Sequence, residues 1–305
     1  MKYSEYILFF IYAAAFTFYL ASSASYAQDN EVKSGQGCEA AGKVIIRLDK
    51  PSFGGRVVWR RMYGSAQNDE ALAVFALGNT VIGLNREEGD NNTVTLTAFD
   101  RNGRLVRQSE FPVANIKSIR NVKTLGSRAY VLADRVDNSS TLSVINEKGT
   151  LLQRKNFLEK GYKTSVTDVI EGDGSSLFVV TNQESLSRNS SFSTLYKLSS
   201  KLDTIWKREI RTGSQTNIKS LVMAKDGSLY LGGDMYSGSR NMALLTHFTQ
   251  NGALDWQKPI PRGKAAEILS LEKDGKDRLF AVGKALPLPE GQQAVWVTLL
   301  DRSGE

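Results

Sequence analysis

Side chains that commonly carry catalysis are scarce in this sequence. Its 305 residues include one histidine, His247, and one cysteine, Cys38. A Ser/His/Asp or Cys/His mechanism would depend entirely on His247, and a Cys/His zinc site needs several such ligands. An intramolecular disulfide would need a second cysteine. We therefore expect no cofactor and no metal site, and we interpret Cys38 as a free thiol.

Paired carboxylates are the remaining route to hydrolytic chemistry. Glu87, Glu88, Asp90 and Asp137 lie in polar segments that we interpret as loops. General acid and base roles require a defined separation between two carboxyl groups, which a sequence does not give. No pair can therefore be assigned, and enzymatic activity is an open alternative rather than the favoured one.

The first 27 residues are typical of an export signal. Lys2 precedes an apolar run from Ile7 to Ala21, and Ser25-Tyr26-Ala27 is a small-x-small cleavage site. An uncleaved anchor is the alternative, but the run is shorter than the roughly 20 residues of a membrane span. We expect cleavage after Ala27, no transmembrane span afterwards, and a periplasmic or secreted protein. Nucleic acid is therefore excluded as a partner.

The rest of the chain repeats with a period of about fifty residues. Five similar segments each place a turn before an apolar strand, and the strands begin 48, 48, 52 and 50 positions apart, at Val81, Ala129, Leu177, Leu229 and Leu279. Asp-Gly and Asn-Gly pairs, as at Asn251-Gly252, supply the positive φ of tight hairpins. Alternation at 93–99 indicates a half-buried strand. Each repeat is read as four short strands, a to d, which is the pattern of a β-propeller blade.

The strand count favours an all-β propeller of five four-stranded blades. We expect a flexible segment at 28–42 and one propeller domain at 43–305. The last blade would take strands a to c from 266–302 and strand d from 57–63, which closes the ring and removes exposed sheet edges. Six blades are the alternative, with the strand at 43–48 beginning a partial blade.

The segment Val58 to Ala71, with Trp59-Arg60-Arg61, resembles a family of exported bacterial β-propeller repeats. Units of that family run W-x-[RK]-x-[YF]-G-G-x-x-x-D, followed by an Asp-Gly hairpin and an Asp-x-x-Gly-x-x-x-Trp hairpin. The segment 251–258 matches the last element well, and 202–208 matches it in part. The family is distantly similar to quinoprotein-like propellers, but this chain lacks their length and their adjacent cysteines. The resemblance implies an exported propeller and no particular reaction.

The loops between strands b and c look longer than the other connections, and the connections from d to a should emerge on the same side. Binding residues tend to lie on such a long-loop face. A polar column there would surround the mouth of the central channel, at Asp69, Asn115, Ser165, Asn217 and, less clearly, Ala265. Capping of nearby backbone N–H groups is the favoured interpretation of this column, and ligand binding is the alternative.

Basic residues also gather on the predicted long-loop side, in a chain whose 39 Lys and Arg against 32 Asp and Glu give a net charge of +7. They are Lys160, Lys163, Arg188, Arg211, Arg240, Arg262 and Lys264. A solvated surface is one interpretation, and a patch for an anionic polysaccharide or lipid headgroups is the other.

His247 falls in a repeat column that the other units fill with Ala98, Val144, Lys197 and Leu299, so a packing or exposed role is expected. Trp59, Trp206 and Trp256 share another column, which indicates packing between blades. We predict a monomeric, non-catalytic propeller that binds a protein or an anionic glycan. A polysaccharide hydrolase with paired carboxylates at the channel mouth is the alternative.

Overall fold

The computed structural model describes residues 69–87, 93–286, 294–301 and 304. All of them belong to one compact unit, residues 44–305. The expected signal peptide at 1–27, the segment at 28–42 and the predicted strands at 43–48 and 57–63 lie outside the described residues. Among the helices of the described part, none has the length and apolar character needed to cross a membrane.

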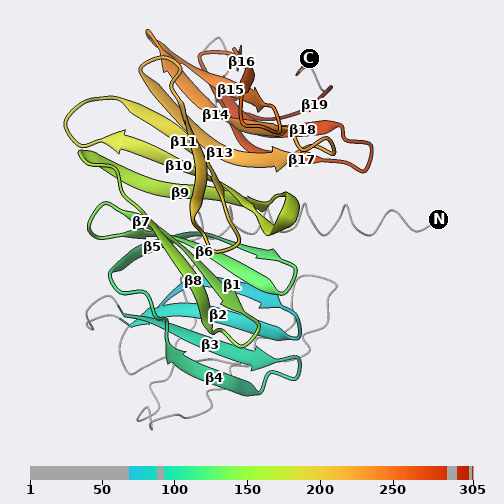
Figure 1. Cartoon of the computed structure of the whole chain (residues 1–305). Helices are drawn as coiled ribbons and strands as arrows, with labels where there is room; N and C mark the ends of the chain where they lie inside the picture. The colour runs from blue at the N-terminus through green and yellow to red at the C-terminus, as the bar shows by residue number, and fades with distance from the viewer. Residues whose placement is uncertain (1–68, 88–92, 287–293, 302–303, 305) are drawn as a thin grey trace, which may run out of the picture. The chain divides into compact units, whose positions relative to one another are not determined.

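The described chain is all-β and consists of consecutive antiparallel sheets (Figure 1). The first sheet contains β1 (Asp69–Leu77), β2 (Thr80–Glu87), β3 (Val94–Asp100) and β4 (Leu105–Glu110). The second contains β5 (Ile116–Leu125), β6 (Arg128–Arg135), β7 (Ser140–Asn146) and β8 (Leu151–Phe157). The third contains β9 (Tyr162–Glu171), β10 (Leu177–Ser185), β11 (Ser191–Leu198) and β12 (Thr204–Ile210), with a 3-10 turn at Asp173–Ser175.

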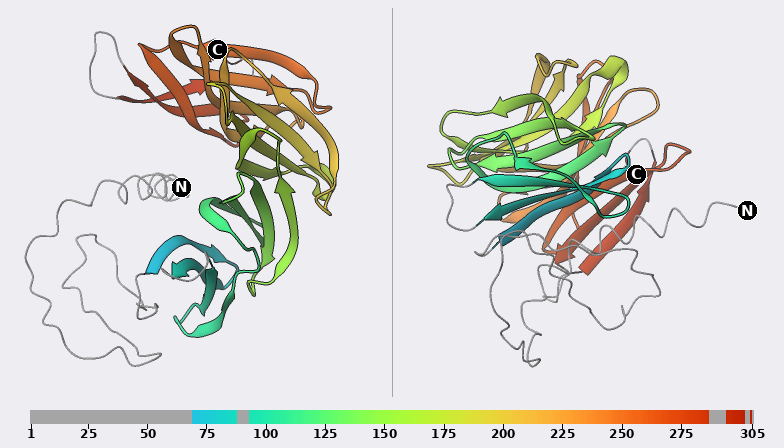
Figure 2. Two further views of the ribbon diagram at one scale, coloured as in Figure 1. Left: turned by 90° about the vertical axis from the view of Figure 1, so that its left-hand side faces the viewer. Right: turned by 90° about the horizontal axis from the view of Figure 1, so that it is seen from below.

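The fourth sheet contains β13 (Gln215–Met223), β14 (Leu229–Ser237), β15 (Arg240–Phe248) and β16 (Leu254–Ile260). A fifth unit contains β17 (Ala265–Lys273), β18 (Leu279–Leu286) and β19 (Ala294–Leu300). One parallel bridge, Asn241 to Ala265, joins it to the fourth sheet. Within every sheet the strands pair in chain order, and both views of Figure 2 show them side by side. The predicted a-b-c-d order and its period are therefore confirmed for the described residues.

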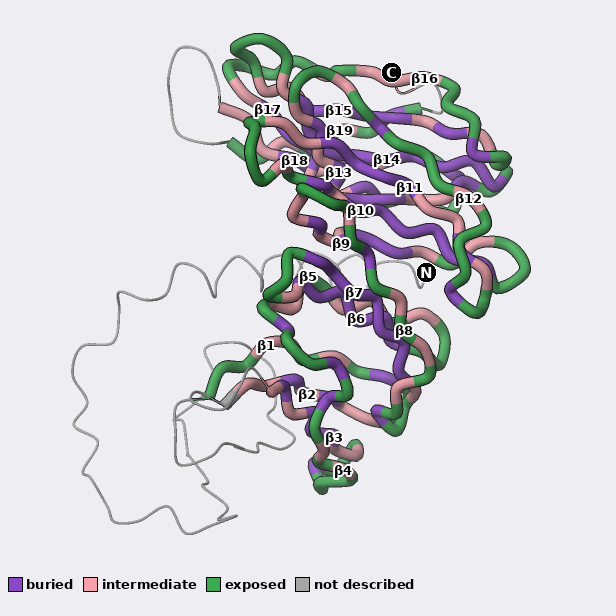
Figure 3. Tube along the Cα trace, turned by 60° about the vertical axis from the view of Figure 1, so that its left-hand side comes forward, coloured by how far each residue is buried: buried purple, intermediate pink, exposed green. Residues whose placement is uncertain are grey.

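The hydrophobic core is divided into four clusters, each lying between two consecutive sheets. The second strand of a sheet supplies both neighbouring clusters, because successive side chains point to opposite faces. Val131 packs toward the first sheet and Leu132 toward the third. Val179 and Val180 divide in the same way. The second strands β6, β10 and β14 are therefore buried along most of their length (Figure 3).

The turns between the third and fourth strands are closed as the sequence predicts. Gly103, Gly149 and Gly252 have φ of 70°, 71° and 76°. Their N–H groups donate to the carbonyls of Asp100, Asn146 and Thr249. The Asp100 carboxylate also accepts from two backbone N–H groups of its own turn. A polar residue followed by glycine three positions later is thus a structural signature of this turn.

The predicted difference in loop length is wrong for the connections that the structure describes completely. The second and third strands run further than expected, so their connections shorten to 136–139, 186–190 and 238–239. Turns at the opposite end, such as 199–203 and 249–253, are no shorter. Polar residues such as those at 184–185 and 236–237 continue the ladder, because strand pairing needs backbone groups and tolerates polar side chains on an exposed face. Loop length therefore does not distinguish the two ends of the sheets.

Each first strand carries a β-bulge at the same repeat position. The bulged residues are Leu72, Arg120, Thr167, Lys219 and Leu269. β5 has one further irregularity, at Lys117. A bulge inserts one residue against the partner strand and re-aims the neighbouring side chains. The bulges therefore fix which polar side chains of the first strands face one another.

Candidate binding groove

Two residues before each bulge, a polar residue of the first strand pairs with a polar residue of the second. We call these the inner polar pairs: Glu70 with Arg86, Ser118 with Asp134, Ser165 with Asn182, Asn217 with Asp234, and Glu267 with Lys284. Glu70 and Glu267 form ion pairs with their partners, at 3.4 and 2.6 Å. The Asn217 amide donates to Asp234 at 3.3 Å. The row is therefore polar in all five units.

Several inner polar pairs also bond to the next sheet. Arg86 Nη2 donates to the carbonyls of Ile116 and Lys117, both at 2.9 Å. Asn182 both donates to the carbonyl of Ile218 and accepts from its N–H, at 3.0 Å each. Burial of these groups demands partners, and the neighbouring backbone supplies them. Part of the row therefore links neighbouring sheets through hydrogen bonds and is not free to bind a ligand.

Bulged lysine and arginine side chains neutralise the buried acids of the row. Arg120 Nε donates to Asp134 at 2.6 Å. Lys219 Nζ lies 3.1 Å from Asp234 and also pairs with Glu267. Burial raises the pKa of Asp234, and the hydrogen bond from Asn217 and the charge of Lys284 oppose that rise. Each of these carboxylates therefore pairs with at least one cation, although Asp134 Oδ1 is buried without a hydrogen-bond partner among the described residues.

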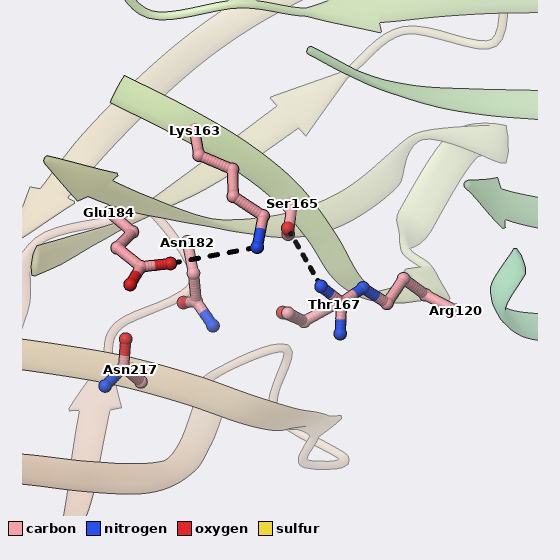
Figure 4. A pocket seen from close by; sticks show the side chains of 7 residues that line it. All are labelled: Arg120, Lys163, Ser165, Thr167, Asn182, Glu184 and Asn217. Carbon is pink, nitrogen blue, oxygen red and sulfur yellow. Dashed lines mark hydrogen bonds and ion pairs between the residues drawn. The ribbon is translucent and has the colours of Figure 1, made fainter. Parts of the chain in front are cut away.

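One groove of about 160 Å³ opens beside this row (Figure 4). The first strands of three consecutive sheets and the second strand of the middle one contribute its lining. The lining residues are Arg120 of β5, Lys163, Ser165 and Thr167 of β9, Asn182 and Glu184 of β10, and Asn217 of β13. Every one of them is polar, and Glu184 is the single carboxylate among them.

The two cations of the groove are held differently. Arg120 is anchored through Nε, and its Nη2 reaches Ser165 Oγ at 3.5 Å, the outer limit of a hydrogen bond. Within the part of the chain that the structure describes, Nη1 has no hydrogen-bond partner. Lys163 Nζ lies 3.8 Å from Glu184, whose side chain is 71% exposed. Figure 4 shows the ends of both cationic side chains close to Ser165.

The structure brings together two of the four predicted site residues. Ser165 and Asn217 line the groove, as does Lys163 of the predicted basic patch. Asp69 opens β1 one position before the inner polar pair. Asn115 precedes β5 with φ of 61°, and its carbonyl accepts from Val136 N–H. Asp69 and Asn115 are not among the lining residues.

The remaining predicted basic residues do not line the groove. Arg188 lies between β10 and β11, and Arg240 opens β15 on an exposed turn. Arg211 pairs with Glu209 at 2.9 Å and stacks over the Phe192 ring at 3.6 Å. Arg262 lies over Trp296 at 4.7 Å. Two of these four arginines are therefore held against aromatic rings.

Sequence reasoning missed Arg120, Thr167, Asn182 and Glu184. Arg120 and Thr167 are bulged, and a bulge leaves no mark in an alignment of turns. Asn182 had a usable signal, because it occupies the repeat position at which Asp134 and Asp234 follow the apolar part of their second strands.

His247 belongs to a packed aromatic cluster away from these lining residues. Its ring stacks on Trp256 at 5.2 Å and lies 4.6 Å from Tyr230, and Nδ1 is 3.0 Å from Asp255. Nε2 is buried without a hydrogen-bond partner among the described residues. No set of three or more His, Cys, Asp or Glu side chains in that part of the chain could hold a metal ion.

Comparison with known proteins supports the fold. No model of a known protein family matches the sequence, and no curated protein does. Among solved structures, a puromycin hydrolase variant matches with a TM-score of 0.51 and 15% identity, over 80% of this chain and 38% of that one. The β-propeller domain of the Trilobed protease from Pyrococcus furiosus matches with a TM-score of 0.47 and 12% identity, over 77% and 69%. An endo-arabinase from Bacteroides thetaiotaomicron matches with a TM-score of 0.40 and 11% identity, over 73% and 90%.

At these identities the likeness is one of fold. The repeated four-stranded sheets of the described chain, with a hydrophobic cluster between each consecutive pair, have the arrangement of β-propeller blades.

Proposed function

We propose that this chain is an exported, non-catalytic β-propeller that binds a glycan in the groove beside its inner polar pairs. The observation that carries the proposal is the lining itself, which is polar throughout and contains one carboxylate, Glu184. Hydrogen-bonding side chains on rigid strands suit a ligand covered with hydroxyl groups. Export follows from the signal-like segment at 1–27 and from the resemblance to exported bacterial repeats.

The polar lining favours a glycan over a protein partner. The buried centre of a protein interface is depleted of charge and enriched in aromatic side chains. No aromatic side chain is among the lining residues of the groove, and the nearby Phe192 ring is covered by Arg211. A sugar instead presents hydroxyl oxygens that can accept from the donors of this lining, chiefly Arg120 and Lys163.

The same lining does not contain the pair of carboxylates that glycoside hydrolysis usually requires. The usual mechanisms need two carboxyl groups on either side of the scissile bond. Glu184 has no second carboxylate beside it in the lining, and the nearby Asp134 is tied to Arg120. Binding without turnover is therefore the better-supported function.

We further propose that the propeller closes with five blades, with residues 57–63 as the fourth strand of the last. β19 exposes Val295, Val297 and Leu299 on one face. The register makes Ala243, Leu245 and His247 their counterparts in β15, and the first two of these are fully buried against the fifth unit. Another sheet covering the exposed face of β19 would complete the pattern.

Filling the groove tests the binding function. Ser165→Phe would occupy it, and Ser239→Phe, in the exposed turn between β14 and β15, is the matched control. Binding is measured on an oligosaccharide array, with new reducing ends assayed in parallel. We expect retained glycans, loss of binding in Ser165→Phe alone, and no cleavage. Cleavage that Glu184→Gln abolishes would establish the hydrolase instead, and equal binding by both Phe variants would exclude the groove.

A further inference from the structure

We infer that the groove recognises the carboxylate of an acidic sugar through Arg120 and Lys163. This inference rests on the proposed function and names its ligand class. The groove provides about 160 Å³, or room for about five water molecules at ~30 Å³ each. That volume suits a single sugar unit with its charged group.

The neutral side chains of the groove have largely used their hydrogen-bonding capacity. Both ends of the Asn182 amide bond to Ile218, and Thr167 donates to the carbonyl of Val180. Asn217 donates to Asp234 and accepts from Ser191. What these groups leave for a ligand is limited, so the principal donors are the two cations. A ligand that accepts hydrogen bonds and carries negative charge is therefore the best complement.

Arg120 is oriented in advance for such a ligand. Its Nε–H is taken by Asp134, which leaves the Nη1 and Nη2 end of the guanidinium toward the groove. Two donors at this spacing match the two oxygens of a carboxylate. The existing contact to Ser165, at 3.5 Å, is weak enough to be replaced.

Lys163 supplies a second, more adjustable charge. Its contact with Glu184 spans 3.8 Å at an exposed position. Exposed ion pairs contribute little stability, so the ammonium can turn to a ligand at low cost. Asp134 and Glu184 offset part of the positive charge, which favours a singly charged ligand over one with several negative charges.

The test compares uronate trisaccharides with their methyl esters, which keep the sugar shape and lose the charge. Trigalacturonate, trimannuronate and a glucuronate trisaccharide are titrated calorimetrically, with a sulfated neutral trisaccharide as a further arm. Arg120→Lys keeps the charge beside Asp134 but loses the two-pronged donor. Lys163→Gln removes the second charge, and Lys160→Gln is the control outside the lining.

We expect at least one uronate to bind, at least about tenfold more tightly than its ester. We also expect Arg120→Lys and Lys163→Gln to weaken it by about tenfold, and Lys160→Gln to leave it unchanged. Equal binding of acid and ester, tighter binding of the sulfated sugar, or absence of uronate binding would overturn the carboxylate assignment. If Ser165→Phe still abolished binding of another glycan, the proposed function would stand. If no glycan bound, both the carboxylate assignment and the proposed function would fail.

Discussion

The indole of Trp206 in β12 lies against Gly252, in the last turn of the next sheet, so closely that a Cβ there would stand 2.6 Å from Cζ2. Arg208 completes the contact by donating from Nε to the Gly252 carbonyl at 3.0 Å, with its guanidinium 5.2 Å from the Trp206 ring. Trp256 stands in the same relationship to Gly304. The W-x-[RK] motif is therefore a clamp on the turn of the following sheet.

Gly252→Ala should destabilise the protein by more than its backbone strain. Gly252 has φ of 76°, and a non-glycine residue in this region costs about 1 to 2 kcal/mol. The clash with Trp206 adds about 1 to 3 kcal/mol. Gly238→Ala is the control, because its φ is 60° and a Cβ there meets nothing within 4 Å. Urea unfolding compares the two variants, and equal losses would show that the clamp adds nothing.

The turns, strand order and repeat period were accessible from the sequence because each depends on local chemistry. Glycine at positive φ and the alternation of apolar residues identify hairpins and strands without knowledge of the partner sheet. The tryptophan column was also predicted as packing between blades, and Trp206 and Trp256 lie there. Their partner, the glycine of the next turn, could not be predicted, because the contact joins residues 46 positions apart (252 − 206).

The lining of the groove could be predicted only in part from the sequence, because it depends on where the bulges lie. Ser165 and Asn217 share their repeat position because each lies two residues before the bulge of its own strand. In β5 the residue two positions before the bulge is Ser118, whereas the predicted Asn115 lies five positions before it. An irregularity of register changes which residues face the groove without changing the composition of the strand.

Asp168→Ala should be among the most damaging substitutions on an inner strand. The buried carboxylate accepts from Leu221 N–H of the next sheet at 2.8 Å and pairs with Lys123 at 2.5 Å. Its loss leaves a buried donor and a cation without partners, at a cost of about 3 to 5 kcal/mol. The residue at the equivalent position of the next sheet is neutral. Ser220 Oγ accepts a hydrogen bond from Leu271 N–H at 3.0 Å. Ser220→Ala should cost about 1 to 3 kcal/mol in the same unfolding measurement. A larger loss of stability in Ser220→Ala than in Asp168→Ala would contradict this account.

Asp234→Asn should change how stability depends on pH. Burial raises the pKa of Asp234 in the folded protein, so the folded state holds this proton above the unfolded value of about 3.9. As pH rises past that value, the unfolded chain ionises first, and the wild type loses stability relative to the variant. The free energy of unfolding of both proteins, measured from about pH 4 to about pH 7, should show the wild-type advantage decreasing with pH.

Asp137→Asn provides a comparison of opposite sign. A hydrogen bond from the Ser139 hydroxyl lowers the pKa of Asp137. The wild type should therefore hold its advantage over this variant above about pH 4 and lose it as pH falls below that value. The same direction for both variants would show that burial does not govern Asp234.

A designed disulfide can test the five-bladed closure directly. In the fourth sheet, Leu245 pairs with Lys258. Transfer of this register to the last unit pairs Val297 with Arg61, since Val297 is the counterpart of Leu245 and Trp59 is that of Trp256. With Cys38 replaced by serine, Val297→Cys and Arg61→Cys should form an intramolecular disulfide on mild oxidation, because directly paired residues meet the geometric requirement. Val297→Cys with Ser239→Cys is the control. Non-reducing electrophoresis and mass spectrometry report the linkage, and its absence, or linkage between molecules alone, would exclude closure by this strand.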